Sequence, residues 1–130
     1  MSCEQQPDIE LEEHGRKVME AIFYLLGNKW SINIIGLLIR SPKRFSEMQK
    51  YLYISPRALT DTLRLLEKYH IISRSVYPTV PVTVEYKLTE AGLTFVDQVV
   101  LPINEWWDEY GNEDILKDET MLQSKLKRNS

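Results

Sequence analysis

A change of hydrophobic periodicity at Tyr69-His70 is the feature that most constrains how this chain can fold. Residues 55–68 carry apolar side chains at helical spacing, whereas residues 71–77 and 82–88 alternate apolar and polar side chains, which is typical of strands. Pro-Thr-Val-Pro at residues 78–81 predicts a stiff hairpin tip between the two strands. The chain must therefore place an amphipathic helix directly before a β-hairpin.

The helix over residues 55–68 has a clear predicted beginning. Ser55 is a good N-cap, and Pro56 suits the first helical position, where its missing N–H costs little. Apolar residues then recur at i, i+4 and i+7, at Leu59, Leu63 and Leu66. We expect these leucines to face the core and the opposite side of the helix to remain available.

A shorter helix is predicted over residues 45–52. We expect Ser46 to cap it in a reciprocal arrangement with Gln49, and Phe45 to pack onto it as a hydrophobic staple. Only Tyr53-Ile54 separates this helix from the next one. That short link is typical of a helix-turn-helix.

Helical patterns also flank this unit, over residues 15–26 and 29–39 before it and from Thr89 to about Trp107 after it. Pro102 predicts a kink or a break near Leu101. The predicted fold class is mainly α with a small β-wing, a winged helix-turn-helix with additional N-terminal and C-terminal helices.

The 130 residues are expected to form one domain. We expect a polar, flexible leader over residues 1–14, the folded domain over residues 15–110, and a polar tail over residues 111–130 that is partly helical or disordered. The chain has no apolar run long enough to span a membrane and no secretory signal pattern, so a cytoplasmic protein is expected.

Positive charge is concentrated in the middle of the chain. Residues 40–74 hold eight basic side chains against three acidic ones, a net charge of +5, whereas the segments before and after them carry −3 and −5. The whole chain has a net charge of −3. A phosphate backbone is bound by a local cationic patch and not by the average charge, so the acidic balance is compatible with a DNA partner.

The available face of the helix over residues 55–68 predicts contacts with DNA bases. In a winged helix-turn-helix this helix enters the major groove, where its outward residues near the N-terminus meet base edges. The candidates are Arg57, Thr60, Asp61 and Arg64. The alternative is a solvated helix face, and Asp61 could instead pair with Arg57 or Arg64.

Polar and basic residues around this helix are candidates for contacts with the DNA backbone, which position a protein without reading sequence. Each could also be an ordinary surface residue, and the two serines are also explained as helix caps. The candidates are Lys43, Arg44, Ser46, Lys50, Ser55, Arg74 and Thr79.

The sequence predicts neither a metal site nor a cofactor. Cys3 is the only cysteine, and His14 and His70 are far apart, so no zinc-ligand spacing occurs. No nucleophile motif or glycine-rich phosphate loop is present, so we expect no enzymatic activity. We interpret His70 as the end of a helix, with a positive φ, and not as a ligand or base.

Several separated motifs resemble the HxlR-type winged-helix transcriptional regulators over about residues 16 to 107. They are Gly27-Asn28-Lys29-Trp30, Arg44-Phe45-Ser46-Glu47, residues 54–60 (ISPRALT), Leu63-Arg64, Leu66-Glu67, Arg74, Tyr77, Pro81 and residues 84–92 (VEYKLTEAG). The resemblance implies a bacterial-type dimeric regulator whose terminal helices, here residues 16–26 and 90–107, form the dimer interface.

The apolar residues of these terminal helices are the candidates for that interface. The C-terminal helix offers more apolar surface than a small core needs, although core packing is the alternative for each residue. The candidates are Val18, Ile22, Val96, Val99, Val100, Ile103, Trp106 and Trp107.

One departure from many similar members concerns a cysteine. Those members carry a cysteine-proline pair about a dozen residues before the tryptophan that corresponds to Trp30, and they use the thiol to sense oxidants or electrophiles. Residues 16–19 read Arg-Lys-Val-Met here, so the resemblance does not predict thiol sensing.

The predicted function is that of a homodimeric, sequence-specific regulator that binds double-stranded DNA at an inverted repeat. The alternative is a winged-helix module that binds proteins and has lost DNA binding. The sequence leaves room for a small-molecule effector near Trp106-Trp107, but it identifies no ligand, signal or target promoter.

Overall fold

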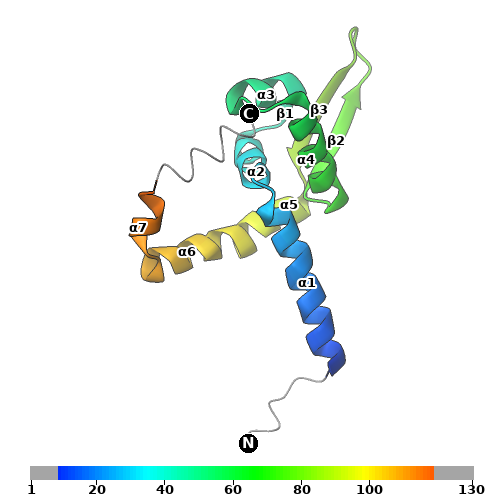
Figure 1. Ribbon diagram of the computed structural model, residues 1–130. Coiled ribbons are helices and arrows are strands. Elements are labelled where there is room, and N and C mark those ends of the chain that lie inside the picture. Colours follow the sequence, from blue (N-terminus) through cyan, green and yellow to red (C-terminus); the bar gives the residue numbers. More distant parts are fainter. Residues whose placement is uncertain (1–8, 119–130) are drawn as a thin grey trace, which may run out of the picture.

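A computed structural model describes residues 9–118 of the chain (Figure 1). Its elements are, in chain order, α1 (Ile9–Gly27), α2 (Ser31–Arg40), β1 (Lys43–Arg44), α3 (Phe45–Leu52), α4 (Pro56–Lys68), β2 (Ile72–Tyr77), β3 (Thr83–Leu88), α5 (Glu90–Phe95), the π-helical turn η2 (Val96–Val100), α6 (Leu101–Tyr110) and α7 (Glu113–Leu116). This order confirms the predicted class, a mainly helical winged helix-turn-helix.

The core lies between α2, α3, α4 and the base of the hairpin. Leu59, Leu63 and Leu66 of α4 are buried, as the helical spacing predicted. They pack in one cluster with Ile34 of α2 and Met48 of α3. Burial of one face of α4 fixes which of its other residues reach solvent.

The sheet has three strands in the order β1-β3-β2, whereas the sequence predicted two. β1 is only Lys43–Arg44 and pairs antiparallel with β3, placing Lys43 opposite Tyr86 and Arg44 opposite Glu85. Two polar residues show no period-2 pattern, so their extended conformation depends on the pairing with β3.

The predicted cap of α3 was wrong, although the bounds of the helix were correct. The N-cap is Arg44, and its backbone N–H donates to Glu47 Oε1 at 2.8 Å. Pairing within β1 holds Arg44 in an extended conformation, so the helix begins at Phe45 and its third residue is Glu47. Ser46 therefore lies inside the first turn and does not cap it.

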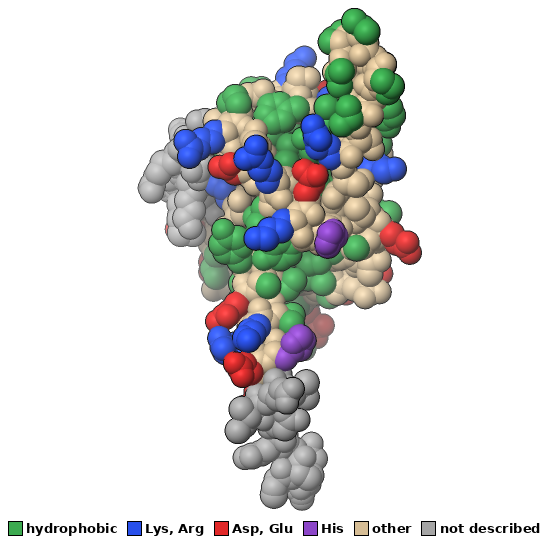
Figure 2. All heavy atoms as spheres, turned by 90° about the vertical axis from the view of Figure 1, so that its right-hand side faces the viewer, with side chains coloured by type: hydrophobic (Ala, Val, Ile, Leu, Met, Phe, Trp, Pro, Cys, Tyr) green, Lys and Arg blue, Asp and Glu red, His purple; other side chains and the backbone are tan. Residues whose placement is uncertain are grey.

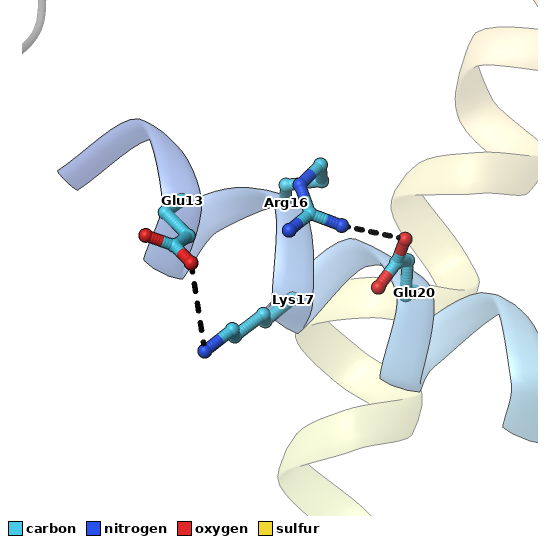
Figure 3. A network of polar contacts seen from close by, with 4 residues as sticks. All are labelled: Glu13, Arg16, Lys17 and Glu20. Atoms are coloured by element: carbon cyan, nitrogen blue, oxygen red, sulfur yellow. Dashed lines mark hydrogen bonds and ion pairs between the residues drawn. The ribbon is translucent and has the colours of Figure 1, made fainter. Parts of the chain in front are cut away.

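Helix α1 begins at Ile9, so residues 9–14 are helical and do not belong to a flexible leader; residues 1–8 lie outside the described part. Two ion pairs with i,i+4 spacing bridge successive turns of this exposed helix: Glu13 with Lys17 at 3.9 Å and Arg16 with Glu20 at 2.9 Å (Figure 3). Such pairs stabilise a helix by roughly 0.3–0.5 kcal/mol each, and acidic residues near its beginning favour the helix dipole.

The helix that begins after Thr89 changes its hydrogen-bond register before Pro102. Thr89 caps α5 by accepting from Gly92 N at 2.9 Å, as predicted. Residues Val96–Val100 then form a π-helical turn, closed by a bond from Leu101 N to Val96 O. Proline has no N–H and its ring crowds the carbonyl four residues earlier, so a local change of register accommodates it without the helix ending.

Gly111 ends α6, and the chain continues into α7. Trp107 Nε1 donates to Glu113 Oε2 at 2.8 Å and ties the two helices together. The predicted tail is thus helical over Glu113–Leu116, and residues 119–130 lie outside the described part.

Among residues 9–118, no single helix is long and apolar enough to cross a membrane. The segments Glu12–Gly27 and Ser31–Arg40 reach that length only together, and they are bent by 77° at their junction. Ile34, Ile35 and Leu38 of the second segment are buried in the protein core.

Candidate nucleic-acid interface

Helix α4 presents its polar face on an open side of the molecule. The hydroxyl of Ser55 accepts from Ala58 N at 3.1 Å, which confirms the predicted cap. Arg57 is almost fully exposed, with 93% of its side chain accessible, and Arg64 is also exposed. Thr60 is half-buried between them. Lys and Arg side chains gather on this face, beside the β-hairpin (Figure 2).

Asp61 forms an ion pair with Arg57, one of the two arginines considered from the sequence. Arg57 Nε lies 4.0 Å from Asp61 Oδ2, and both side chains are exposed. An exposed pair of this length contributes little to stability. The carboxylate nevertheless lies beside a guanidinium that could otherwise meet a base, so it can influence the orientation of Arg57.

Arg64 of α4 and Arg74 of β2 border the same hollow, which has a volume of about 320 Å³. It is also lined by Thr60 and Leu63 of α4, and Arg74 lies directly opposite Tyr86 across the hairpin. The remaining lining residues are Phe45, Glu67 and Tyr86. Sequence reasoning missed Phe45, Glu67 and Tyr86, because only the packing of α4 against the sheet brings them together.

The residues that are candidates for contacts with the DNA backbone differ in position and in whether their side chains are free to bind. Lys43 Nζ donates to Ser41 Oγ at 2.5 Å and to Ser41 O at 3.3 Å, beside a hollow lined by residues of α2 and α3. Lys50 is exposed on α3, where it lines another shallow hollow with Glu47 and Tyr53. Arg44 and Ser46 are exposed at the beginning of α3.

The tip of the hairpin is apolar and internally bonded. The hydroxyl of Thr79 donates to Pro81 O at 2.7 Å and lies 2.8 Å from the hydroxyl of Thr83. Val80 and Val82 are exposed there, and residues 75–84 contain no charged side chain. A contact from Thr79 to DNA would therefore compete with bonds inside the turn.

Two long-range contacts hold α4 in place against α1 and the following loop. Asn28 Oδ1 accepts from Trp30 N at 2.9 Å and lies 3.4 Å from Thr62 Oγ1 on the buried side of α4. At the other end, Tyr69 OH donates to Ala21 O at 2.7 Å. These polar contacts were not predicted, since no local spacing relates residues so far apart.

Lys29 lies in the loop between α1 and α2. Its Nζ is 4.8 Å from the centre of the Trp30 ring, which permits a cation–π contact. Desolvation at this position lowers the pKa of Lys29 below its ordinary value.

The candidate interface residues on the terminal helices divide into two groups. Val18, Ile103 and Trp106 are exposed. The others are half-buried: Ile22, Val96, Val99 and Val100 pack against the core cluster, and Trp107 is bonded to Glu113. Further exposed apolar residues lie on the same helices, namely Met19, Phe23, Tyr24, Leu93, Leu101 and Tyr110.

The chain matches the HxlR-like helix-turn-helix family over residues 25–115. It is 40% identical to the HTH-type transcriptional regulator YodB of Bacillus subtilis (strain 168) over 93 residues, which are 71% of this chain and 82% of YodB. The match to the structure of the reduced form of YodB covers 68% of this chain and 86% of the YodB chain, with a TM-score of 0.60.

The reduced form of the redox regulator HypR is 38% identical to this chain, with a TM-score of 0.64, and the match covers 76% of this chain and 96% of HypR.

Proposed function

The chain belongs to the HxlR-like helix-turn-helix family and is a transcriptional regulator of helix-turn-helix type, and on this premise we propose that it binds DNA sequence-specifically as a homodimer. The target is an inverted-repeat operator in double-stranded DNA, and the protein acts in the cytoplasm. Helix α4 lies in the major groove of each half-site.

The exposed face of α4 is the observation that carries the proposed DNA binding. Arg57 and Arg64 reach solvent one above the other on a helix whose opposite face is buried, so both can approach a groove together. Arginine pairs with guanine through two hydrogen bonds, which supplies base preference. The net charge of +5 over residues 40–74 supplies attraction to the phosphate backbone.

The exposed apolar surface of α1 and α6 supports the proposed dimer. Phe23 and Trp106 are 62% and 59% exposed, and α1 extends away from the rest of the domain (Figure 1). A helix with so little packing is marginal in water, because most helical stability in proteins comes from tertiary contacts. A second copy of α1 and α6 would bury this surface through a two-fold interface.

A two-fold dimer explains the choice of an inverted repeat. Its symmetry presents two copies of α4 to half-sites that are related by the same symmetry, about one helical turn or ~34 Å apart. Each copy then makes the same base contacts on its half-site.

The test of DNA recognition begins with selection of bound sites from random duplex DNA by the purified protein. Arg64→Ala should then reduce the preference for the selected site over random DNA by about 1–3 kcal/mol, because a base contact is lost. Lys50→Ala should weaken binding to all sequences alike and reduce the dependence on salt. Lys68→Ala removes a cation from the last turn of α4, outside the proposed base contacts, and is the matched control for the loss of one positive charge.

Unchanged affinities of Arg64→Ala for both kinds of DNA would show that α4 does not read the site in this way. No enrichment of any sequence, together with no salt-dependent binding to duplex DNA, would favour the protein-interaction module.

The test of the dimer uses sedimentation equilibrium of variants that place a charge on the apolar surface. Phe23→Glu and Trp106→Glu should each shift the protein from dimer to monomer, because an unpaired carboxylate would be buried in the interface. Tyr51→Glu, at an exposed aromatic residue on α3, is the matched control. Wild-type protein that sediments as a monomer at micromolar concentration would refute the proposed assembly.

This regulator has no cysteine thiol in α1 that could sense an oxidant or electrophile. Residues 16–19 of α1 contain no cysteine, and Cys3 lies outside the described residues.

A further inference from the structure

The hollow between α4 and the sheet combines aromatic walls with two guanidinium groups. Phe45, Leu63 and Tyr86 supply apolar surface, and Arg64 and Arg74 supply positive charge. Its volume of about 320 Å³ is at the lower end of the range for small-molecule sites, which suits a ligand with a single ring. We propose that this hollow binds a small aromatic carboxylate and that the bound ligand excludes DNA from α4.

The two arginines are available to a carboxylate. Within residues 9–118, neither Arg64 nor Arg74 lies within ion-pair distance of an acidic side chain, although Glu67 lines the same hollow. Arginine binds carboxylates through paired, charge-assisted hydrogen bonds. The charges of the lining residues total +1, from two arginines and one glutamate, so a monoanion is favoured over a dianion or a cation.

The apolar walls select an aromatic ligand among carboxylates. Leu63 is almost completely buried, and Phe45 and Tyr86 are partly buried against the core. A flat ring can contact both aromatic side chains and remove their exposed surface from water. An aliphatic acid such as acetate is too small to make these contacts.

A DNA duplex would cover the mouth of the hollow rather than fill it. Thr60 and Arg64 line the hollow and are also the proposed base-contacting residues, so ligand and DNA require the same side chains. Binding of either partner must therefore weaken binding of the other by the same factor. This regulatory step rests on the proposed DNA binding, whereas the ligand site itself does not.

The first experiment measures ligand binding calorimetrically on the full chain without DNA, with benzoate as the probe. Benzoate should bind saturably with one site per chain. Acetate, which lacks the ring, and benzamide, which lacks the negative charge, should each bind at least about tenfold more weakly. Equal binding of benzoate and acetate, or of benzoate and benzamide, would overturn the proposed ligand class. No saturable benzoate binding at millimolar concentration would overturn the site.

Three glutamine variants of lining residues, with a fourth as control, test the assignment of residues by the sign of their effects. Arg64→Gln and Arg74→Gln should each weaken benzoate binding about tenfold. Glu67→Gln should strengthen it severalfold, because it removes a like charge from the lining. Lys68→Gln, on the same helix but outside the lining, should leave benzoate affinity within about twofold of wild type. Equal affinities in all four variants would overturn the site.

The second experiment measures DNA binding with benzoate present. Benzoate should raise the apparent dissociation constant for the selected site in proportion to its concentration, and acetate at the same ionic strength is the control for screening by salt. If saturating benzoate raised the apparent dissociation constant for DNA no more than acetate does, the proposed competition would be overturned. Benzoate binding by a protein that does not bind DNA would refute the proposed function and leave the ligand site supported.

Discussion

The same substitution, glycine to alanine, should have opposite effects at Gly92 and Gly36. A Cβ at Gly92 would lie 2.1 Å from Ile71 O and 3.2 Å from Leu88 Cδ2, where no carbon can fit. Ile71 O is not free to move, because it accepts hydrogen bonds from Thr89 N at 3.0 Å and Thr89 Oγ1 at 3.2 Å. Helix α5 must therefore shift away from the beginning of β2.

The magnitude of the Gly92→Ala effect follows from these contacts. Overpacking of this kind costs about 1–3 kcal/mol, and weakening one of the bonds to Ile71 O adds about 1 kcal/mol. The higher helix propensity of alanine offsets about 0.5–1 kcal/mol of this cost inside α5, so we expect the free energy of unfolding to fall by about 1–3 kcal/mol. Gly36 is exposed inside α2 and has no atom within 4 Å of an added Cβ. Gly36→Ala should therefore raise that free energy by about 0.5–1 kcal/mol, through the higher helix propensity of alanine.

Urea denaturation of both variants and the wild type, followed by circular dichroism at one protein concentration, measures the two effects. The common concentration matters because dissociation of a dimer contributes to apparent stability. Effects of the same sign at both positions, or a Gly92→Ala variant as stable as wild type, would refute the close packing of α5 on Ile71.

Three further substitutions can be measured in the same assay. Ser55→Ala should destabilise the protein by about 1 kcal/mol, because the N-cap bond to Ala58 is lost; an unchanged midpoint would contradict the cap. Ser31→Ala should stabilise it by up to about 1 kcal/mol, because the buried Ser31 hydroxyl has no hydrogen-bond partner among the described residues; a loss of stability would reveal a missed partner. His70→Gly should stabilise it by about 0.5–1 kcal/mol, because His70 has a φ of 61°; a destabilised variant would contradict that conformation.

Much of the fold could be predicted because its signals are local. The bounds of α3 and α4, the Ser55 and Thr89 caps and the two hairpin strands depend on residues within one or two turns of each other. His70 does adopt a positive φ, two residues after the end of α4, as its position indicated. The spacing of apolar residues along the helix also predicted the burial of Leu59, Leu63 and Leu66.

Other features could not be predicted, because they depend on pairing between distant segments. β1 exists through its pairing with β3, and that pairing moves the cap of α3 from Ser46 to Arg44. Likewise, the ammonium of Lys43 is bonded to Ser41, and the hydroxyl of Thr79 is bonded within the hairpin tip. Sequence position alone had made both residues equal candidates for DNA contact.

The sequence by itself determined which helix is amphipathic, where it begins and which charges it carries, because helix caps and periodicity act over a few residues. Only the tertiary structure decided which of those charges share a surface with other elements. Arg64 and Arg74 come together because α4 packs against the sheet on its leucine face, and Phe23 and Trp106 stay exposed because the core is complete without them. Burial is a property of the whole packed chain, and it decides which residues that are candidates from the sequence have side chains that can reach a partner.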